Sequence, residues 1–293
     1  GGNYCAGGSG VAVGMSFGQT GVLYNLKTVG GGTLTSAAGT NSAISFGSIT
    51  TPATYSVQAT MTATGCTNAM TGTVTVGTVN VPVAQTVTGG GSYCSGGSGV
   101  AVGLTNSGAG VNYQLFNGST AGSIVPGTGS SITFGSQTSA GVYTVMATQT
   151  TGAVSCTTPM SGSATVVVNS NPAVYSVTGG GSYCSGGTGL SVGLNGSQAG
   201  VNYALYTGTV VATTIAGTGS AITFGTFTAT GTYTVRATNA TTSCVSVMSG
   251  NAVISINSLP LGYSVWGGGS DCAGSKGLSV TLSGSQTGVS CTL

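Results

Sequence analysis

The stretch GGGSYCSGGSG, residues 89–99, decides the fold of this chain because it returns as GGGSYCSGGTG from Gly179. Two altered forms are GGNYCAGGSG at the amino terminus and GGGSDCAGSKG from Gly267. Their cysteines, 88 to 90 residues apart, are Cys5, Cys94, Cys184 and Cys272. This period is the size of a domain and exceeds the roughly 20 to 50 residues of a solenoid repeat. The chain is therefore predicted to be a tandem array of small domains.

Charged side chains are almost absent from the 293 residues, and there is no histidine. About a quarter of an ordinary soluble domain is charged. Acid–base catalysis, nucleophilic triads, calcium loops and zinc sites all need histidine or carboxylates, and three cations cannot neutralise a nucleic-acid backbone. We therefore predict a chain that is not an enzyme and has no cofactor, metal site or nucleic-acid partner. The charged residues are Lys27, Arg236, Lys276 and Asp271.

The 56 glycines are compatible with a disordered linker or with a folded β-protein. Between the glycine-rich strings, however, Val, Ile, Leu, Tyr and Phe alternate with polar residues, which is the pattern of strands. No apolar run reaches the roughly 18 residues of a membrane helix. The chain begins inside a repeat signature, without a signal peptide, and ends inside a strand. We interpret it as a section of a longer polypeptide.

The register of the repeats predicts domains at 1–80, 81–170 and 171–258 and a truncated fourth at 259–293. The first repeat lacks the strand that should precede its signature. Each complete repeat is expected to contain five alternating strands of an antiparallel sandwich. They are 10–13, 22–26, 43–46, 55–59 and 72–76, then 100–104, 111–116, 132–134, 142–147 and 164–168, then 190–194, 201–206, 222–224, 232–237 and 252–256.

Three sets of aromatic residues fall into register and are expected to form the cores. Burying one such ring is worth roughly 1.5 to 3 kcal/mol. The sets are Tyr24, Tyr113 and Tyr203; Phe46, Phe134 and Phe224; and Tyr55, Tyr143 and Tyr233. Prolines mark the joints, where they limit backbone freedom, so short linkers and a rod of stacked domains are expected. They are Pro82, Pro172 and Pro260.

Each complete repeat has a second cysteine, 60 to 62 residues after the first. This regularity, without a CxxC pair or a histidine, favours one disulfide per domain over zinc and an oxidising, extracellular location. Closing such a loop stabilises a domain by about 4 kcal/mol in the chain-entropy model. The expected bonds are Cys5–Cys66, Cys94–Cys156 and Cys184–Cys244.

The fourth repeat leaves two alternatives for its cysteines. The partner of Cys272 is expected beyond the end of the sequence, because Cys291 occupies the register of Tyr24, Tyr113 and Tyr203. We favour a buried free thiol at Cys291 over a Cys272–Cys291 bond. The glycine string before each first cysteine has no following helix or lysine, so we interpret it as a tight crossing with positive φ angles and not as a phosphate site.

The consensus of the repeats, VTGGGSYCSGG, GVNYxLY, GTGSAITFG, GTYTVxATNATTxC and MSGSATVxVN, resembles Ig-like repeats of very large Bacteroidota surface proteins. These include gliding-type adhesins exported by the type IX secretion system. The resemblance covers essentially the whole chain and implies an Ig-like sandwich of about seven strands. The repeats have no core tryptophan, and their second cysteine follows the strand tyrosine by 11 to 13 residues, not two. A disulfide from the start of the domain to a late loop is thus expected, and a tyrosine corner is left open.

The resemblance implies a stalk that holds a binding tip away from the cell surface. The expected partners are neighbouring repeats, secretion or motility machinery and extracellular polysaccharide. Two alternatives are a self-assembling filament or sheet, favoured by the near-zero charge, and repeats that themselves bind polysaccharide or surfaces. The stalk predicts monomeric units without a tight ligand.

Overall fold

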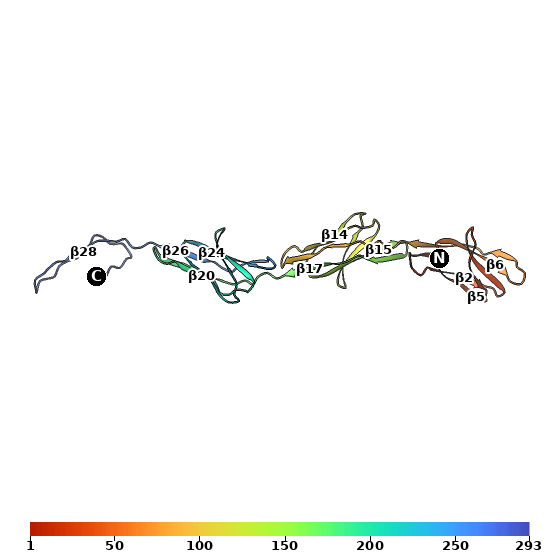
Figure 1. Cartoon of the computed structure of the whole chain (residues 1–293), viewed down its shortest axis with the longest axis horizontal. Helices are drawn as coiled ribbons and strands as arrows, with labels where there is room; N and C mark the ends of the chain where they lie inside the picture. The colour runs from red at the N-terminus through yellow and green to blue at the C-terminus, as the bar shows by residue number, and fades with distance from the viewer. Residues whose placement is uncertain (293) are drawn as a thin grey trace. The chain divides into compact units, whose positions relative to one another are not determined.

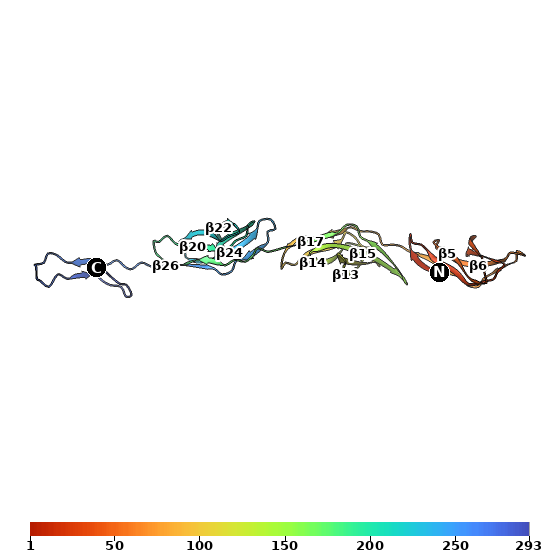
Figure 2. The same cartoon turned by 90° about the horizontal axis from the view of Figure 1, so that it is seen from below.

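The computed structural model describes residues 1–292, and this part of the chain contains strands and turns without a helix. The strands form three sets in the same order, β1–β8, β9–β17 and β18–β26, followed by β27 and β28 (Figures 1 and 2). The prediction of an all-β chain is confirmed. The five strands expected in each complete repeat are all present, with bounds shifted by a few residues.

The bounds of the strands follow the repeat. The first set is β1 (Gly2–Cys5), β2 (Val11–Gly18), β3 (Val22–Thr28), β4 (Thr33–Ala38), β5 (Ser42–Ile49), β6 (Ala53–Met61), β7 (Thr67–Ala69) and β8 (Val74–Val79). The second is β9 (Val87–Gly89), β10 (Gly91–Cys94), β11 (Val100–Leu104), β12 (Asn112–Asn117), β13 (Thr120–Pro126), β14 (Ile132–Gln137), β15 (Gly141–Thr151), β16 (Val154–Pro159) and β17 (Ala164–Asn169). The third is β18 (Val177–Gly179), β19 (Gly181–Cys184), β20 (Leu190–Leu194), β21 (Val201–Thr207), β22 (Val210–Ala216), β23 (Ile222–Phe227), β24 (Gly231–Asn239), β25 (Val245–Val247) and β26 (Ala252–Asn257). The last two are β27 (Val265–Gly267) and β28 (Val280–Leu282).

Each complete set forms two sheets. In the second repeat the larger sheet has the order β10-β17-β15-β12-β13, with β16 paired to β15, and the smaller has the order β14-β11-β9. The third repeat has the same two sheets, and the first has the larger sheet but only β2-β5 as the smaller. The leading segment of a repeat is thus divided between both sheets, as in an Ig-like sandwich. The predicted fold class is confirmed.

A separate hydrophobic core lies in each complete repeat, within residues 13–76, 87–166 and 192–254. All nine aromatic residues predicted for the cores are buried, with at most 9% of their surface exposed. The chain divides into two compact units, Gly1–Val168 and Asn169–Leu293, and the first unit holds two of the three cores. The boundaries at 80, 170 and 258 stay predictions, and the last residue of the fourth repeat, Leu293, lies outside the described residues.

The glycine string carries the chain from one sheet to the other. Gly89 ends β9 in the smaller sheet and Gly91 begins β10 in the larger one. Residues 89, 90 and 91 have φ angles of 91°, 79° and 130°, which only glycine adopts readily. A Cβ at Gly89 would lie 2.1 Å from the Ala101 carbonyl oxygen. The string is therefore a crossing with positive φ angles, as predicted.

Candidate functional site: a disulfide between repeats

The described residues contain no group of three or more His, Cys, Asp or Glu side chains that could hold a metal ion. No helix among them is long and apolar enough to span a membrane. The chemistry of the chain is concentrated in its cysteines, which therefore form the candidate site.

Cys5 and Cys156 form a disulfide with an S–S distance of 2.05 Å and a Cα–Cα distance of 5.6 Å. Cys5 ends β1 of the first repeat, and Cys156 lies in β16 of the second. The Cys156 sulfur is 3.9 Å from the Val79 carbonyl oxygen, and the Cys5 sulfur is 3.7 Å from that of Ser155. Cys156 is only 1% exposed. The bond is a covalent link between two neighbouring repeats.

This pairing corrects the sequence-based one. Because Cys5 bonds to Cys156, the predicted Cys5–Cys66 and Cys94–Cys156 bonds do not form. Cys66 and Cys184 are exposed free thiols, so the predicted Cys184–Cys244 bond does not form either. Cys94 and Cys244 are both disulfide-bonded. The prediction of one disulfide within each domain is therefore wrong, although four of the cysteines do form disulfides.

The reason is that the two cysteines of a repeat lie at opposite ends of its larger sheet. Cys5 is in register with Val79 at the end of β8, and Cys66 follows the end of β6, which runs antiparallel to β8. β6 has nine residues and spans about 30 Å at roughly 3.3 Å per residue, whereas disulfide Cα atoms lie within about 7 Å. Cys184 and Cys244 are separated in the same way.

The cysteines of the fourth repeat are both free and exposed. The free thiol at Cys291 is therefore confirmed, and the alternative bond between Cys272 and Cys291 does not form. The predicted burial of Cys291 is wrong. Among the described residues of this repeat, β27 and β28 are the strands, and they pair with each other.

The tyrosine before each first cysteine anchors the strand that carries it. The hydroxyl of Tyr183 donates to the Thr228 carbonyl oxygen at 2.5 Å, on the loop between β23 and β24. The equivalent tyrosines donate to equivalent carbonyl oxygens, Tyr4 to Thr50 and Tyr93 to Thr138. Sequence reasoning missed this role, although the repetition of Tyr-Cys in three signatures was a signal for it.

A tyrosine corner, left open by the sequence, is present in every complete repeat. Tyr55, Tyr143 and Tyr233 lie near the starts of β6, β15 and β24. Each hydroxyl donates to the carbonyl oxygen four residues upstream, at 2.6, 2.8 and 2.9 Å. This is the hydrogen bond that defines the tyrosine corner of Ig domains. The unusual cysteine spacing does not displace it.

Comparison with known proteins gave fold-level likenesses only. No family model and no curated protein matches the chain. Among solved structures, the full ectodomain of mouse nectin-like molecule 4 is 12% identical, with 87% of this chain and 96% of that chain covered and a TM-score of 0.35. The ICAM-5 D1–D4 ectodomain fragment is 16% identical, with 80% and 68% covered and a TM-score of 0.40. Because these scores are low, the Ig-like assignment rests on the strand order.

Proposed function

We propose that this chain is a non-catalytic stalk segment of a large secreted cell-surface adhesin, in which the Cys5–Cys156 disulfide joins two neighbouring Ig-like repeats. The observation that carries the proposal is the Cys5–Cys156 bond, because a stalk must transmit tension. Disulfides also persist in oxidising, extracellular surroundings. The stalk spaces a binding tip from the cell and serves surface attachment or gliding. By the resemblance of its repeats, it belongs to a Bacteroidota protein exported by type IX secretion.

The bond changes the path that tension takes through the chain. When the ends are pulled, force passes from Cys5 through the two sulfurs to Cys156, a sequence separation of 151. Because the bond bridges the ends of this loop, unfolding the first repeat cannot lengthen the molecule. At up to about 3.6 Å per residue, the loop withholds roughly 500 Å of extended chain. This limit on extension suits a spacer that is pulled repeatedly.

Single-molecule stretching of the whole chain tests the proposal. We expect the reduced chain to extend at least about 500 Å further than the oxidised chain before it is taut. A chain with both Cys94→Ser and Cys156→Ser should lengthen when oxidised, because neither disulfide then shortens the covalent path between the ends. Cys66→Ser is the matched control at the equivalent position of the first repeat and should leave the oxidised length unchanged. Equal extension of the oxidised and reduced chains would remove the mechanical argument for a stalk.

Self-assembly is a second candidate, favoured by the edge strands of the larger sheets. β13 and β22 lie at open edges, and Ile124, Val210 and Val211 on them are 60%, 69% and 48% exposed. A nearly uncharged edge of this kind offers little resistance to pairing with another copy. Sedimentation of the oxidised chain over a hundredfold range of concentration distinguishes the two functions. A stalk segment stays monomeric, whereas a filament subunit grows with concentration.

A further inference from the structure

A pocket of about 330 Å³ opens on the second repeat, where the segment that leads into β9 passes the turn between β11 and β12. Its lining lies within residues 80–149 of the first compact unit and includes the buried Val111 and Tyr113. No charged side chain lines it, but four carboxamides do, each at least partly exposed, namely Asn80, Gln85, Asn106 and Gln149. The pocket therefore offers uncharged donors and acceptors to a small molecule.

One residue of this turn differs from its counterparts in the other repeats. The second repeat has Gly108 where the others have glutamine, at Gln19, Gln198 and Gln286. In all four turns, the valine three residues later donates its N–H to the carbonyl oxygen of this residue, at 3.2 or 3.3 Å. The backbone of the turn is thus the same, and the second repeat differs by a missing side chain.

The glutamine makes a defined contact in the third and fourth repeats. The Ala173 N–H donates to the side-chain oxygen of Gln198 at 2.6 Å, and the Leu261 N–H donates to that of Gln286 at 3.1 Å. Each donor directly follows the proline of its joint. The equivalent donor of the second repeat is the N–H of Val83, which lines the pocket, and no described residue accepts from it. The pocket therefore presents an N–H donor at the place where the other two repeats hold a carboxamide oxygen.

The residues beside this donor also differ from those of the later repeats. In the third repeat the ring of Tyr175 lies against Gly196, where a Cβ would be 2.5 Å from the Tyr175 Cε1 atom. The fourth repeat has the same tyrosine and glycine in the same contact. The corresponding residues of the second repeat are Gln85 and Asn106. Two carboxamides thus replace an aromatic ring and a glycine next to the Val83 N–H.

We propose that this pocket binds the acetamido group of a sugar unit in an uncharged extracellular polysaccharide. The acetamido oxygen takes the position of the missing glutamine oxygen and accepts from the Val83 N–H, and the methyl group packs on Val111 and Tyr113. The surrounding carboxamides donate to and accept from the sugar hydroxyls. A volume of about 330 Å³ is at the lower end for ligand sites and suits one sugar ring. A charged ligand would be desolvated without a partner. This binding is additional to the stalk function and does not depend on it.

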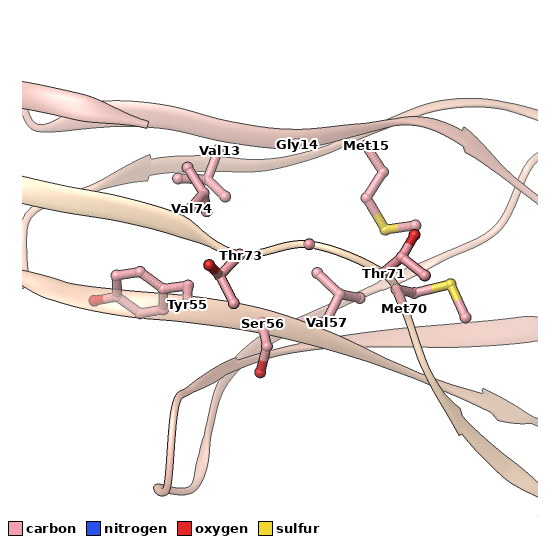
Figure 3. A pocket seen from close by; sticks show the side chains of 11 residues that line it. Val13, Gly14, Met15, Tyr55, Ser56, Val57, Met70, Thr71, Thr73 and Val74 are labelled. Carbon is pink, nitrogen blue, oxygen red and sulfur yellow. The ribbon is translucent and has the colours of Figure 1, made fainter.

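The test uses the full oxidised chain and N-acetylglucosamine, with glucose as the matched sugar that has no acetamido group. In two-dimensional NMR spectra, N-acetylglucosamine should cause saturable shifts of the Val83 and Gly108 amide signals. Glucose should bind at least about tenfold more weakly, because the Val83 N–H then gains no acceptor. Figure 3 shows the pocket of the first repeat, which has valine and methionine side chains but no carboxamide and serves as the internal reference. Its Val57 and Met70 signals should not move.

Three results would overturn the proposal. The first is equal binding of the two sugars, and the second is the absence of saturable shifts at Val83 and Gly108. The third is acetamide binding as tightly as N-acetylglucosamine, which would show that the pocket recognises a carboxamide and not a sugar.

Variants of the pocket separate its contacts. Gly108→Gln restores the residue of the other repeats and should abolish binding, because its own carboxamide then accepts from the Val83 N–H. The side chain fits, since three repeats hold glutamine on the same backbone turn. Gly108→Ala is the matched control, which adds no carboxamide and should bind normally. Gln85→Leu should weaken binding several-fold, because one partner of the sugar hydroxyls is lost. Circular dichroism verifies that each variant is folded, and undiminished binding by Gly108→Gln would refute the site.

Discussion

The tyrosine corner gives each repeat a buried hydrogen bond, which can be tested by removing the tyrosine hydroxyl. Tyr233 is 1% exposed, and its hydroxyl donates to the Ala229 carbonyl oxygen at 2.9 Å. Tyr233→Phe should lower the free energy of unfolding of the third repeat by about 1 to 2 kcal/mol, because a carbonyl oxygen loses its donor. Tyr206→Phe removes a hydroxyl from a half-buried ring of the same repeat. It should change the free energy of unfolding by less than about 0.5 kcal/mol. Urea unfolding measures both, and equal losses would contradict the corner's role.

Tyr203 makes the third repeat sensitive to alkali. Burial raises the pKa of Tyr203 above its ordinary value of 10.0; the Gln198 N–H bonded to its oxygen opposes the shift, and Tyr175 adds to it. The folded state therefore holds this proton more tightly than the unfolded state. The resulting stability is full below pH 10 and is lost as the pH rises through the folded pKa. Urea titrations between pH 8 and about 11 should show a smaller alkaline loss for Tyr203→Phe than for the unaltered chain. Parallel curves would contradict this.

The cysteines show a limit of reasoning from spacing. In a tandem repeat, the separation of two positions recurs whether they lie in one repeat or in neighbouring ones. The separation of Cys5 from Cys66 and that of Cys5 from Cys156 both follow the period, so regularity could not choose between them. The choice depends on which end of the sheet each cysteine occupies. The position of Cys5 follows from the pairing register of β1 with β8, which places Cys5 beside Val79. The spacing of the cysteines does not contain this information.

At the scale of elements, the glycine string before β10 is predicted to tolerate no side chain at its centre. Gly90 has a φ of 79°, and a Cβ there would lie 2.6 Å from the Thr165 carbonyl oxygen. Gly96 has a similar φ of 82°, but a Cβ there would meet nothing within 4 Å. Gly96→Ala should therefore cost only the strain of the left-handed backbone, about 1 to 2 kcal/mol. Gly90→Ala should lower the stability further, because the backbone at residue 90 must also move away from the Thr165 carbonyl oxygen of β17. Thermal unfolding compares them, and equal costs would refute the steric explanation.

The strands that sequence reasoning found differ from those it missed in what surrounds them. β3, β12 and β21 alternate buried and accessible residues, so the period-2 pattern revealed them. β4, β13 and β22 lie at sheet edges and are mostly exposed on both faces. Threonine, glycine and alanine suffice there, and no alternation marks them. The alternation of apolar and polar residues therefore predicts the core strands. The edge strands form by hydrogen bonding to a neighbouring strand, and their own sequence does not show that pairing.

At the scale of the molecule, the bond between repeats predicts how the chain responds to the loss of one cysteine. The intact chain has four free thiols, at Cys66, Cys184, Cys272 and Cys291. In Cys156→Ser, Cys5 cannot turn to Cys66, because about 30 Å of sheet separates the ends on which they lie. Thiol titration of the denatured, unreduced protein should therefore find about one more thiol than in the intact chain, with Cys5 as the additional site by mass mapping.

Pairing of Cys5 with Cys66 in Cys156→Ser would lower the number of free thiols instead of raising it. If Cys5 re-paired with Cys66 in Cys156→Ser, the same titration would find about one thiol fewer than in the intact chain, and a cystine peptide within the first repeat would appear. Cys66→Ser is the matched control, because it removes a thiol that is already free and should leave the Cys5–Cys156 peptide intact. The two results differ by two thiols per chain, so the titration decides whether the covalent unit is one repeat or a pair of neighbours. Only a disulfide between neighbouring repeats lets force bypass the first repeat.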